Sequence, residues 1–180
     1  MAKRLSTGRN EVGMLSDIRE IAERVGEEVL GFPVEWFVEG EQAKSAKRPD
    51  VIIRRADGNP EVIASGEAKR PETPAGLHPY VMSEVDGAVG KAKALGGAYA
   101  FTTNFLGVAL FDVAKYDSTD YLGAMLGDPI DLIDEKETAV TGWWGTLTKE
   151  RREALVRPGL EVLFAQLRKW MPDRAPIWTE

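Results

Sequence analysis

Two carboxylates and an ammonium group occur at spacings that could support hydrolytic chemistry. Asp50 opens an apolar run at 51–53, and Glu67 and Lys69 close a second run at 62–66. Because side chains alternate between the two faces of a strand, Glu67 and Lys69 point the same way, and Asp50 can join them from a neighbouring strand. Such a group suits a hard divalent cation together with a residue that positions a nucleophilic water. The pattern therefore predicts phosphodiester hydrolysis, the reaction of a nuclease.

The same residues also allow an ordinary structural interpretation. Glu67 and Lys69 could form a same-face ion pair, which contributes about 0–1 kcal/mol when it is exposed. Three features favour the functional interpretation. The small residues Gly66 and Ala68 flank the charges, the charges lie at the ends of apolar strands, and a turn sequence at 57–60 joins the two strands as a hairpin.

Apolar periodicity and turn signals predict a mixed α/β (α+β) domain around these residues. A helix is expected from Asn10, as its N-cap, to a stop at Gly31 and Pro33. The other expected elements are strands at 34–38, 51–55 and 61–68, a helix at 80–95, and strands at 98–103 and 107–111. The short turns predict antiparallel pairing, and the second helix suits a crossover packed on the sheet.

These elements divide the chain into three regions. Residues 1–9 are expected to be a disordered lead-in, and 10–112 a core with a mixed central sheet flanked by helices. Residues 113–180 are expected to form a mostly helical extension packed on the core, which could lead into a further domain. Within it, 116–125 is predicted as a short helix, and Pro158 is predicted to split the amphipathic stretch 148–170 into two helices.

Helix geometry adds a further candidate site residue, Glu11. At about 100° per residue, Glu11 aligns with the apolar stripe that includes Leu15, Ile18 and Ala22. A carboxylate on a core-facing stripe needs a partner such as a metal, a water or a basic residue, so we expect Glu11 to look into the site. The alternative is that the helix begins later and Glu11 is exposed near its N-terminus, where a negative charge is favourable.

The composition argues against several classes of site. The 180 residues include no Cys and a single His, which disfavours disulfides, Cys-ligated zinc and His-dependent nucleases. No secretory signal and no apolar run of membrane-spanning length are evident, so a soluble cytoplasmic protein without a membrane partner is expected. The net charge is −6, although basic residues outnumber acidic ones over 44–70. Weak DNA affinity through this local patch is expected, and a solvated charged hairpin is the alternative.

The sequence Pro49-Asp50, followed by Glu67-Ala68-Lys69, resembles the signature of the PD-(D/E)XK nuclease superfamily. The expected order of elements over 10–112 is also similar to the restriction-endonuclease-like core of that family. The stretches 67–71, 91–96 and 103–104 further resemble N-terminal nuclease domains of type I-like restriction enzymes and of fused restriction–modification proteins.

This resemblance implies a role for each motif residue. Asp50 and Glu67 would be metal ligands, the Ala68 carbonyl would be a third ligand, and Lys69 would position or activate the attacking water. Glu11 matches a carboxylate that many members place on the first helix, where it contacts the metal directly or through water. Mg²⁺ is the implied cofactor, with Mn²⁺ as a substitute.

Four other residues are weaker candidates for nucleic-acid binding. Arg70, Lys91 and Lys93 could contact phosphates, with solvated surface as the equal alternative. Asn104 could touch a backbone phosphate, although a turn role explains it as well. The sequence thus predicts a metal-dependent DNA endonuclease domain of a restriction–modification or anti-phage system. Its expected partners are a methyltransferase, motor or specificity domain or subunit, and homodimerisation is conceivable. The alternative is a catalytically silent nuclease-fold platform that binds DNA or a protein.

Overall fold

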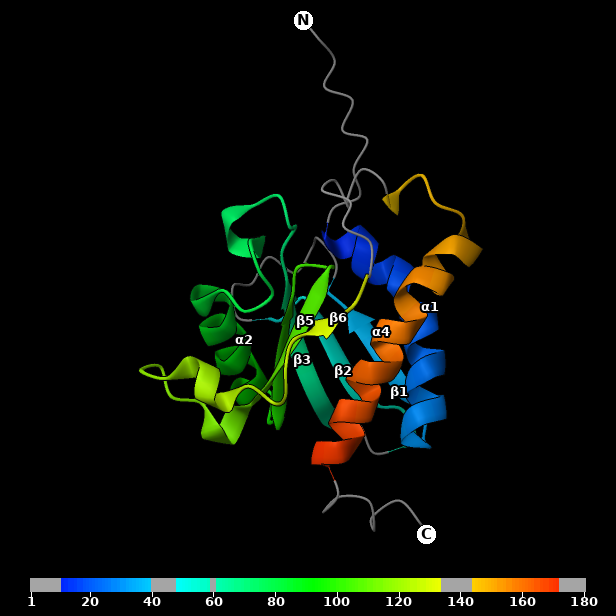
Figure 1. Cartoon of the computed structure of the whole chain (residues 1–180). Coiled ribbons are helices and arrows are strands. Elements are labelled where there is room, and N and C mark those ends of the chain that lie inside the picture. Colours follow the sequence, from blue (N-terminus) through cyan, green and yellow to red (C-terminus); the bar gives the residue numbers. More distant parts are fainter. Residues whose placement is uncertain (1–10, 40–47, 59–60, 134–143, 172–180) are drawn as a thin grey trace, which may run out of the picture.

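The computed structural model describes residues 11–39, 48–58, 61–133 and 144–171. Its strands form one open six-stranded sheet in the order β1-β2-β3-β4-β5-β6 (Figure 1). All neighbouring strands are antiparallel except β3 and β4, which are parallel. The strands are β1 Val34–Val38, β2 Val51–Arg55, β3 Val62–Ala68, β4 Tyr99–Thr103, β5 Gly107–Asp112 and β6 Ile130–Asp131.

Helices cover both faces of this sheet. The helices α1 (Glu11–Leu30) and α4 (Lys149–Trp170) pack against each other on one face, and α2 (Met82–Ala94) lies on the other (Figure 1). Because α2 lies between β3 and β4 in the chain, it forms the crossover that parallel strands require. The predicted mixed α/β class with a helix-flanked sheet is confirmed.

The first half of the chain follows local sequence signals closely. α1 ends at Leu30, where Gly31 adopts a φ of 81° that favours glycine. β1 and β2 have the predicted bounds, and the next four elements differ from their predicted ends by one or two residues. The expected lead-in at 1–9, the N-cap Asn10 and parts of the extension (134–143 and 172–180) lie outside the described residues. Among the described helices, none is long and apolar enough to cross a membrane.

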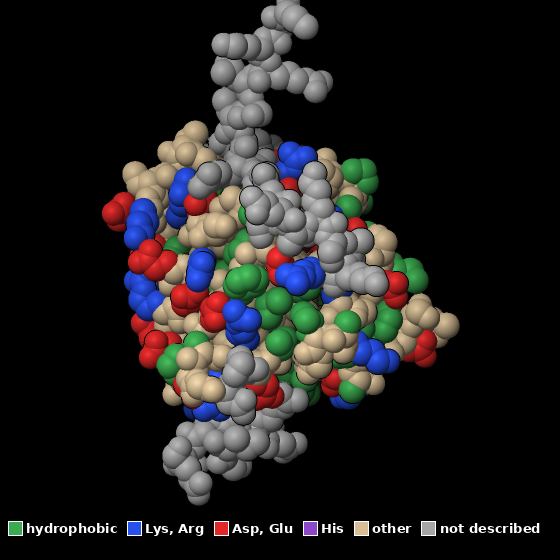
Figure 2. Space-filling model, turned by 180° about the vertical axis from the view of Figure 1, so that it is seen from behind, with side chains coloured by type: hydrophobic (Ala, Val, Ile, Leu, Met, Phe, Trp, Pro, Cys, Tyr) green, Lys and Arg blue, Asp and Glu red, His purple; other side chains and the backbone are tan. Residues whose placement is uncertain are grey.

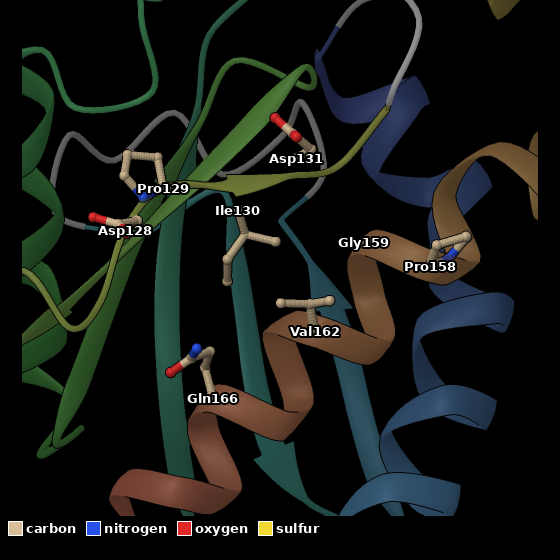
Figure 3. Close-up of a pocket in the computed structure, with 8 residues that line it drawn as sticks. All are labelled: Asp128, Pro129, Ile130, Asp131, Pro158, Gly159, Val162 and Gln166. Carbon is tan, nitrogen blue, oxygen red and sulfur yellow. The ribbon is translucent and has the colours of Figure 1, made fainter.

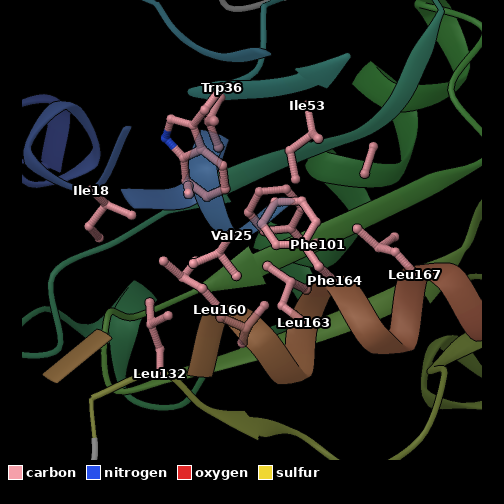
Figure 4. Packing of buried hydrophobic residues seen from close by; sticks show 14 of the residues in the cluster. Ile18, Val25, Trp36, Ile53, Phe101, Leu132, Leu160, Leu163, Phe164 and Leu167 are labelled. Carbon is pink, nitrogen blue, oxygen red and sulfur yellow. The ribbon is translucent and has the colours of Figure 1, made fainter. Parts of the chain in front are cut away.

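Two apolar clusters join the layers. The larger cluster lies between the sheet and the α1/α4 pair, and Figure 4 shows Trp36 and Phe101 of the sheet close to Val25 of α1 and Phe164 of α4. The smaller cluster joins α2 to β4 and β5 through Val85, Ala88, Val89, Ala92, Ala100, Ala109 and Phe111. This arrangement holds α2 against the sheet face onto which the predicted site residues project.

The helix α4 continues through Pro158, so the prediction of two helices is wrong. Pro158 removes one backbone donor, whose acceptor would be the carbonyl of Ala154. Both residues are exposed, so water can replace the missing partner. The buried face runs past the proline without interruption, through Val156, Gly159, Leu160, Leu163, Phe164 and Leu167. Burial contributes about 1.5–3 kcal/mol for each large apolar side chain, which together exceeds the ~3 kcal/mol cost of one internal proline.

The predicted helix at 116–125 is also not formed. The chain instead makes two short 3₁₀ turns, at Val113–Lys115 and Tyr121–Ala124. Within the predicted helix, Oδ1 of Asp117 accepts hydrogen bonds from the backbone N–H and from the hydroxyl of Thr119. Side-chain hydrogen bonds of this kind compete with a continuous α-helix.

Candidate active site on the α2 face of the sheet

Strand register brings the carboxylates of Asp50 and Glu67 side by side. Val51 of β2 pairs with Gly66 of β3, so the preceding residue, Asp50, lies opposite Glu67. The backbone N–H of Asp50 donates to the carbonyl of Gly66 over 3.0 Å, which extends the pairing to the site. Oδ2 of Asp50 accepts a 2.8 Å hydrogen bond from the backbone N–H of Ala68. The two carboxylates therefore occupy one face of neighbouring strands, as the hairpin predicts.

Packing explains why the residue before Glu67, Gly66, has no side chain. Gly66 points to the face opposite Glu67, where the ring of Phe101 lies against the backbone. A Cβ on Gly66 would lie only 2.3 Å from that ring. A larger residue here would push β3 away from the core, and it would carry the adjacent Glu67 out of position.

Glu67 is a buried carboxylate with an unusual proton affinity. It is only 5% exposed. Burial, together with the negative charge of Asp50 and a hydrogen bond to Asp50, raises the pKa of Glu67 to about 7, although Lys91 acts in the opposite direction. Two adjacent carboxylates with little access to solvent repel each other when both are ionised. A bound cation would reduce this electrostatic repulsion. Shifted carboxyl groups of this kind are concentrated at functional sites.

The cation nearest to Glu67 is supplied by α2. Nζ of Lys91 lies 2.5 Å from Oε1 of Glu67, and the two side chains are 21% and 6% exposed. Lys91 was predicted only as a phosphate contact, and its pairing with Glu67 was not predicted. The spacing of charges in α2 is a signal for this contact. Glu84 and Lys91 are seven residues apart and so lie on one face of the helix, and this face meets Lys69 and Glu67.

Lys69 also meets α2, through Glu84. The backbone N–H of Lys69 donates to the carbonyl of Thr103 over 3.0 Å, so β3–β4 pairing continues past the end of β3. Lys69 therefore keeps the strand alternation and shares the α2 face with Glu67. Its Nζ lies 4.0 Å from Oε2 of Glu84, at the limit of an ion pair, and the Lys69 side chain is 39% exposed. This loosely held ammonium can reorient toward a ligand.

Glu11 lies near the motif, but its partner is basic. The Glu11 carboxylate, at the start of α1, lies 3.5 Å from Nε of Arg70 and is 30% exposed. Helix α1 begins at Glu11, which agrees with the predicted alignment of Glu11 with the apolar face of this helix. Of the partners predicted for this carboxylate, the structure provides the basic residue.

The remaining candidates divide into a surface residue and a turn residue. Lys93 is exposed on α2. Asn104 is 5% exposed, and its Oδ1 accepts backbone hydrogen bonds from Leu106 and Gly107 while its Nδ2 donates to Gly76. Asn104 thus closes the β4–β5 turn and ties it to the loop after the motif, which is the turn role.

In the described parts of the predicted basic region 44–70, which are 48–58 and 61–70, the basic side chains are paired with carboxylates. Lys44 and Lys47 lie outside the described residues. Five of the basic residues form ion pairs with carboxylates, namely Arg48–Glu39, Arg54–Glu35, Arg55–Asp57, Lys69–Glu84 and Arg70–Glu11. On the face seen in Figure 2, Lys and Arg side chains likewise lie among Asp and Glu side chains rather than in one basic patch. Strong electrostatic attraction of nucleic acid to this face is therefore not expected.

The donor set of Asp50 and Glu67 fits a magnesium ion. Mg²⁺ is commonly bound through one or two carboxylates while it keeps several waters, and two adjacent carboxylates provide that. Within 11–39, 48–58, 61–133 and 144–171, no group of three or more His, Cys, Asp or Glu is placed to hold a metal. The two-carboxylate pair is thus the arrangement on which a metal hypothesis depends.

A groove elsewhere does not coincide with these residues. It has a volume of about 450 Å³ and lies where α4 crosses β6 (Figure 3). Its lining includes Asp131, Pro158, Val162 and Gln166, and a Cβ on Gly159 would lie 2.5 Å from the carbonyl oxygen of Asp131. The close approach explains the glycine. Two aspartates, Asp128 and Asp131, line the groove, but both are exposed, unlike the buried Glu67.

Comparisons of the chain with protein-family models, curated proteins and solved structures give no match.

Proposed function

We propose that this chain is a Mg²⁺-dependent endodeoxyribonuclease domain of the PD-(D/E)XK type. One observation carries the proposal: Asp50 and Glu67 lie side by side on β2 and β3, and Lys69 follows on the same face of the sheet. Two carboxylates and an ammonium in this relation can hold a divalent cation and act on a phosphodiester.

The order of elements supports the same proposal. A helix, a three-stranded antiparallel unit, a crossover helix and a parallel fourth strand follow one another in α1, β1–β3, α2 and β4. This order is similar to the restriction-endonuclease-like core that the motif implies. In that setting the domain would act in the cytoplasm, in a restriction–modification or anti-phage system beside a methyltransferase, motor or specificity component.

Each site residue then has a chemical task. Asp50 and Glu67 would hold the metal, with the Ala68 carbonyl as the third ligand implied by the resemblance. When bound, Mg²⁺ would polarise the scissile phosphate and lower the pKa of a water molecule. Lys69 orients the attacking water and stabilises the negative charge that develops on the phosphate oxygens. A new bond forms between the water oxygen and phosphorus, the bond from phosphorus to O3′ breaks, and a 5′-phosphate and a 3′-hydroxyl remain.

Cleavage of supercoiled plasmid tests the proposal directly. Wild type is compared with Asp50→Asn and Lys69→Ala in Mg²⁺, in Mn²⁺ and in EDTA, and Lys149→Ala serves as a control on the exposed surface of α4, on the other face of the sheet. Nicking or linearisation by wild type and Lys149→Ala, lost in both site variants and in EDTA, is the expected result. Cleavage that survives Lys69→Ala and EDTA would refute it.

A catalytically silent platform is the second candidate function. The observation in its favour is that Lys69 and Arg70 are each accompanied by a carboxylate, which suits a fold that retains the site without using it. Calorimetry separates the two candidates. A platform would bind DNA or a protein without binding Mn²⁺ at Asp50 and Glu67, whereas a nuclease would lose Mn²⁺ binding on Asp50→Asn.

A further inference from the structure

The Lys91 ammonium occupies the position of a counter-cation at the carboxylate pair. Its Nζ lies 2.5 Å from Oε1 of Glu67, and Glu67 in turn lies against Asp50. Both partners are largely withdrawn from solvent, with side chains 21% and 6% exposed. Lys91 reaches the site from α2, whose neighbouring residue Ala92 is packed in the cluster against the sheet. The helix therefore holds the base of this side chain in a constant position.

A divalent cation and this ammonium compete for the same oxygen. Metal coordination by Oε1 of Glu67 is disfavoured while this oxygen accepts a hydrogen bond from Lys91 at 2.5 Å, because the two positive charges repel each other at short range. The four-carbon stem of lysine is flexible and its ammonium is strongly hydrated, so Lys91 can leave by rotation about its side-chain bonds alone.

We infer that Lys91 is the resident counter-cation of the site and that metal binding displaces it from Glu67, as an exchange of one cation for another. This inference rests on the proposed function, because it assigns Lys91 a role at the same metal site. The exchange leaves Lys91 as a free ammonium beside the bound metal. Binding of the metal thus also makes the Lys91 ammonium available to contact a phosphate ligand.

Metal titration of a charge-removing variant provides the first test. Mn²⁺ binding is measured by calorimetry at pH 8 for wild type, Lys91→Met and Lys93→Met, where Lys93 supplies a matched loss of charge on the same helix. Removing the competitor is expected to lower the Mn²⁺ dissociation constant by roughly 5- to 150-fold, the usual range of a coupling between two ligands. Lys93→Met is expected to leave it within about twofold of wild type. An equal or weaker affinity in Lys91→Met overturns the inference.

A wild-type measurement decides the matter if Lys91→Met does not fold. Lysine acetylation by an amine-reactive ester, read by mass spectrometry at each site, is compared with and without saturating Mn²⁺. Lys91 is expected to become several-fold more reactive when it leaves Glu67, while Lys93 is unchanged. Mn²⁺ binding without a change at Lys91 overturns this inference alone. Absence of Mn²⁺ binding by wild type overturns the proposed function together with it.

Discussion

The backbone N–H of Ala68 donates a 2.8 Å hydrogen bond to Oδ2 of Asp50. Ala68, which lies between Glu67 and Lys69, therefore fixes the carboxylate of Asp50, a residue 17 positions before Glu67 in the chain. The bond crosses from β3 to the start of β2, so it also locks the hairpin register at the site.

Replacing Asp50 by Asn should lower the pKa of Glu67. The negative charge of Asp50 and its hydrogen bond both raise that pKa, so a neutral amide removes both effects. Carboxyl ¹³C NMR titration in EDTA measures the change. Asp57→Asn, at a carboxylate paired with Arg55, is the control and should leave Glu67 unchanged. An unaltered pKa in Asp50→Asn would show that the two carboxylates do not interact.

Glu67 should make the metal-free protein less stable as the pH rises. Its folded pKa of about 7 exceeds the ordinary 4.5. The folded state therefore retains a proton that the unfolded state releases between these values. Stability from this group is fully present below pH 4.5, falls as the pH rises through 7, and levels off above it, for a loss of up to about 3 kcal/mol.

Urea unfolding of wild type and Glu67→Gln at pH 5 and pH 8, in EDTA, isolates this contribution. Gln keeps the size of the side chain and does not titrate, so the loss of stability between the two pH values should be smaller in the variant. Any constant cost of leaving Lys91 without its carboxylate cancels in the comparison. Parallel pH dependences in the two proteins would contradict the prediction.

Lys69→Ala should impair cleavage without impairing folding. The Lys69 side chain is 39% exposed and only 4.0 Å from Glu84, so this pair contributes at most about 1 kcal/mol to stability. Loss of an ammonium that stabilises developing charge is expected to reduce the cleavage rate by about 10²–10³-fold. Thermal unfolding and plasmid cleavage under single-turnover conditions measure the two effects. Cleavage at the wild-type rate would show that Lys69 takes no part in catalysis, and loss of the folded state would assign it a structural role.

Gly159→Ala should destabilise the protein although alanine is the better helix former. A Cβ at this position of α4 would lie 2.5 Å from the carbonyl oxygen of Asp131 and 2.7 Å from Cα of Leu132, so overpacking should cost about 1–3 kcal/mol. Gly87→Ala in α2 is the matched control. No atom lies within 4 Å of its Cβ position, and the substitution should stabilise by about 0.5–1 kcal/mol. Urea unfolding compares them, and stabilisation by both would disprove the α4–β6 contact.

Local patterns were sufficient for most elements of the first 112 residues. α1, β1 and β2 follow from apolar periodicity and glycine stops, because those signals act within a few residues of one another. The proximity of Asp50 and Glu67 was also foreseeable, because a hairpin and the period of a strand together determine which side chains share a face. The single helix α4 was not foreseeable, because its continuity through Pro158 depends on packing against α1 and β6.

Strand alternation and a short turn are local properties of the chain, so the amino-acid sequence is enough to bring Asp50 and Glu67 together at β2 and β3. The partners of these residues depend instead on how separate elements pack. The placement of α2 across the sheet brings Lys91 to Glu67 and Glu84 to Lys69, and the start of α1 brings Glu11 to Arg70. These pairings join residues of separate elements, and their geometry depends on how whole faces pack, which no local pattern records. The burial that raises the pKa of Glu67 has the same origin, because it exists only once α2 covers the sheet.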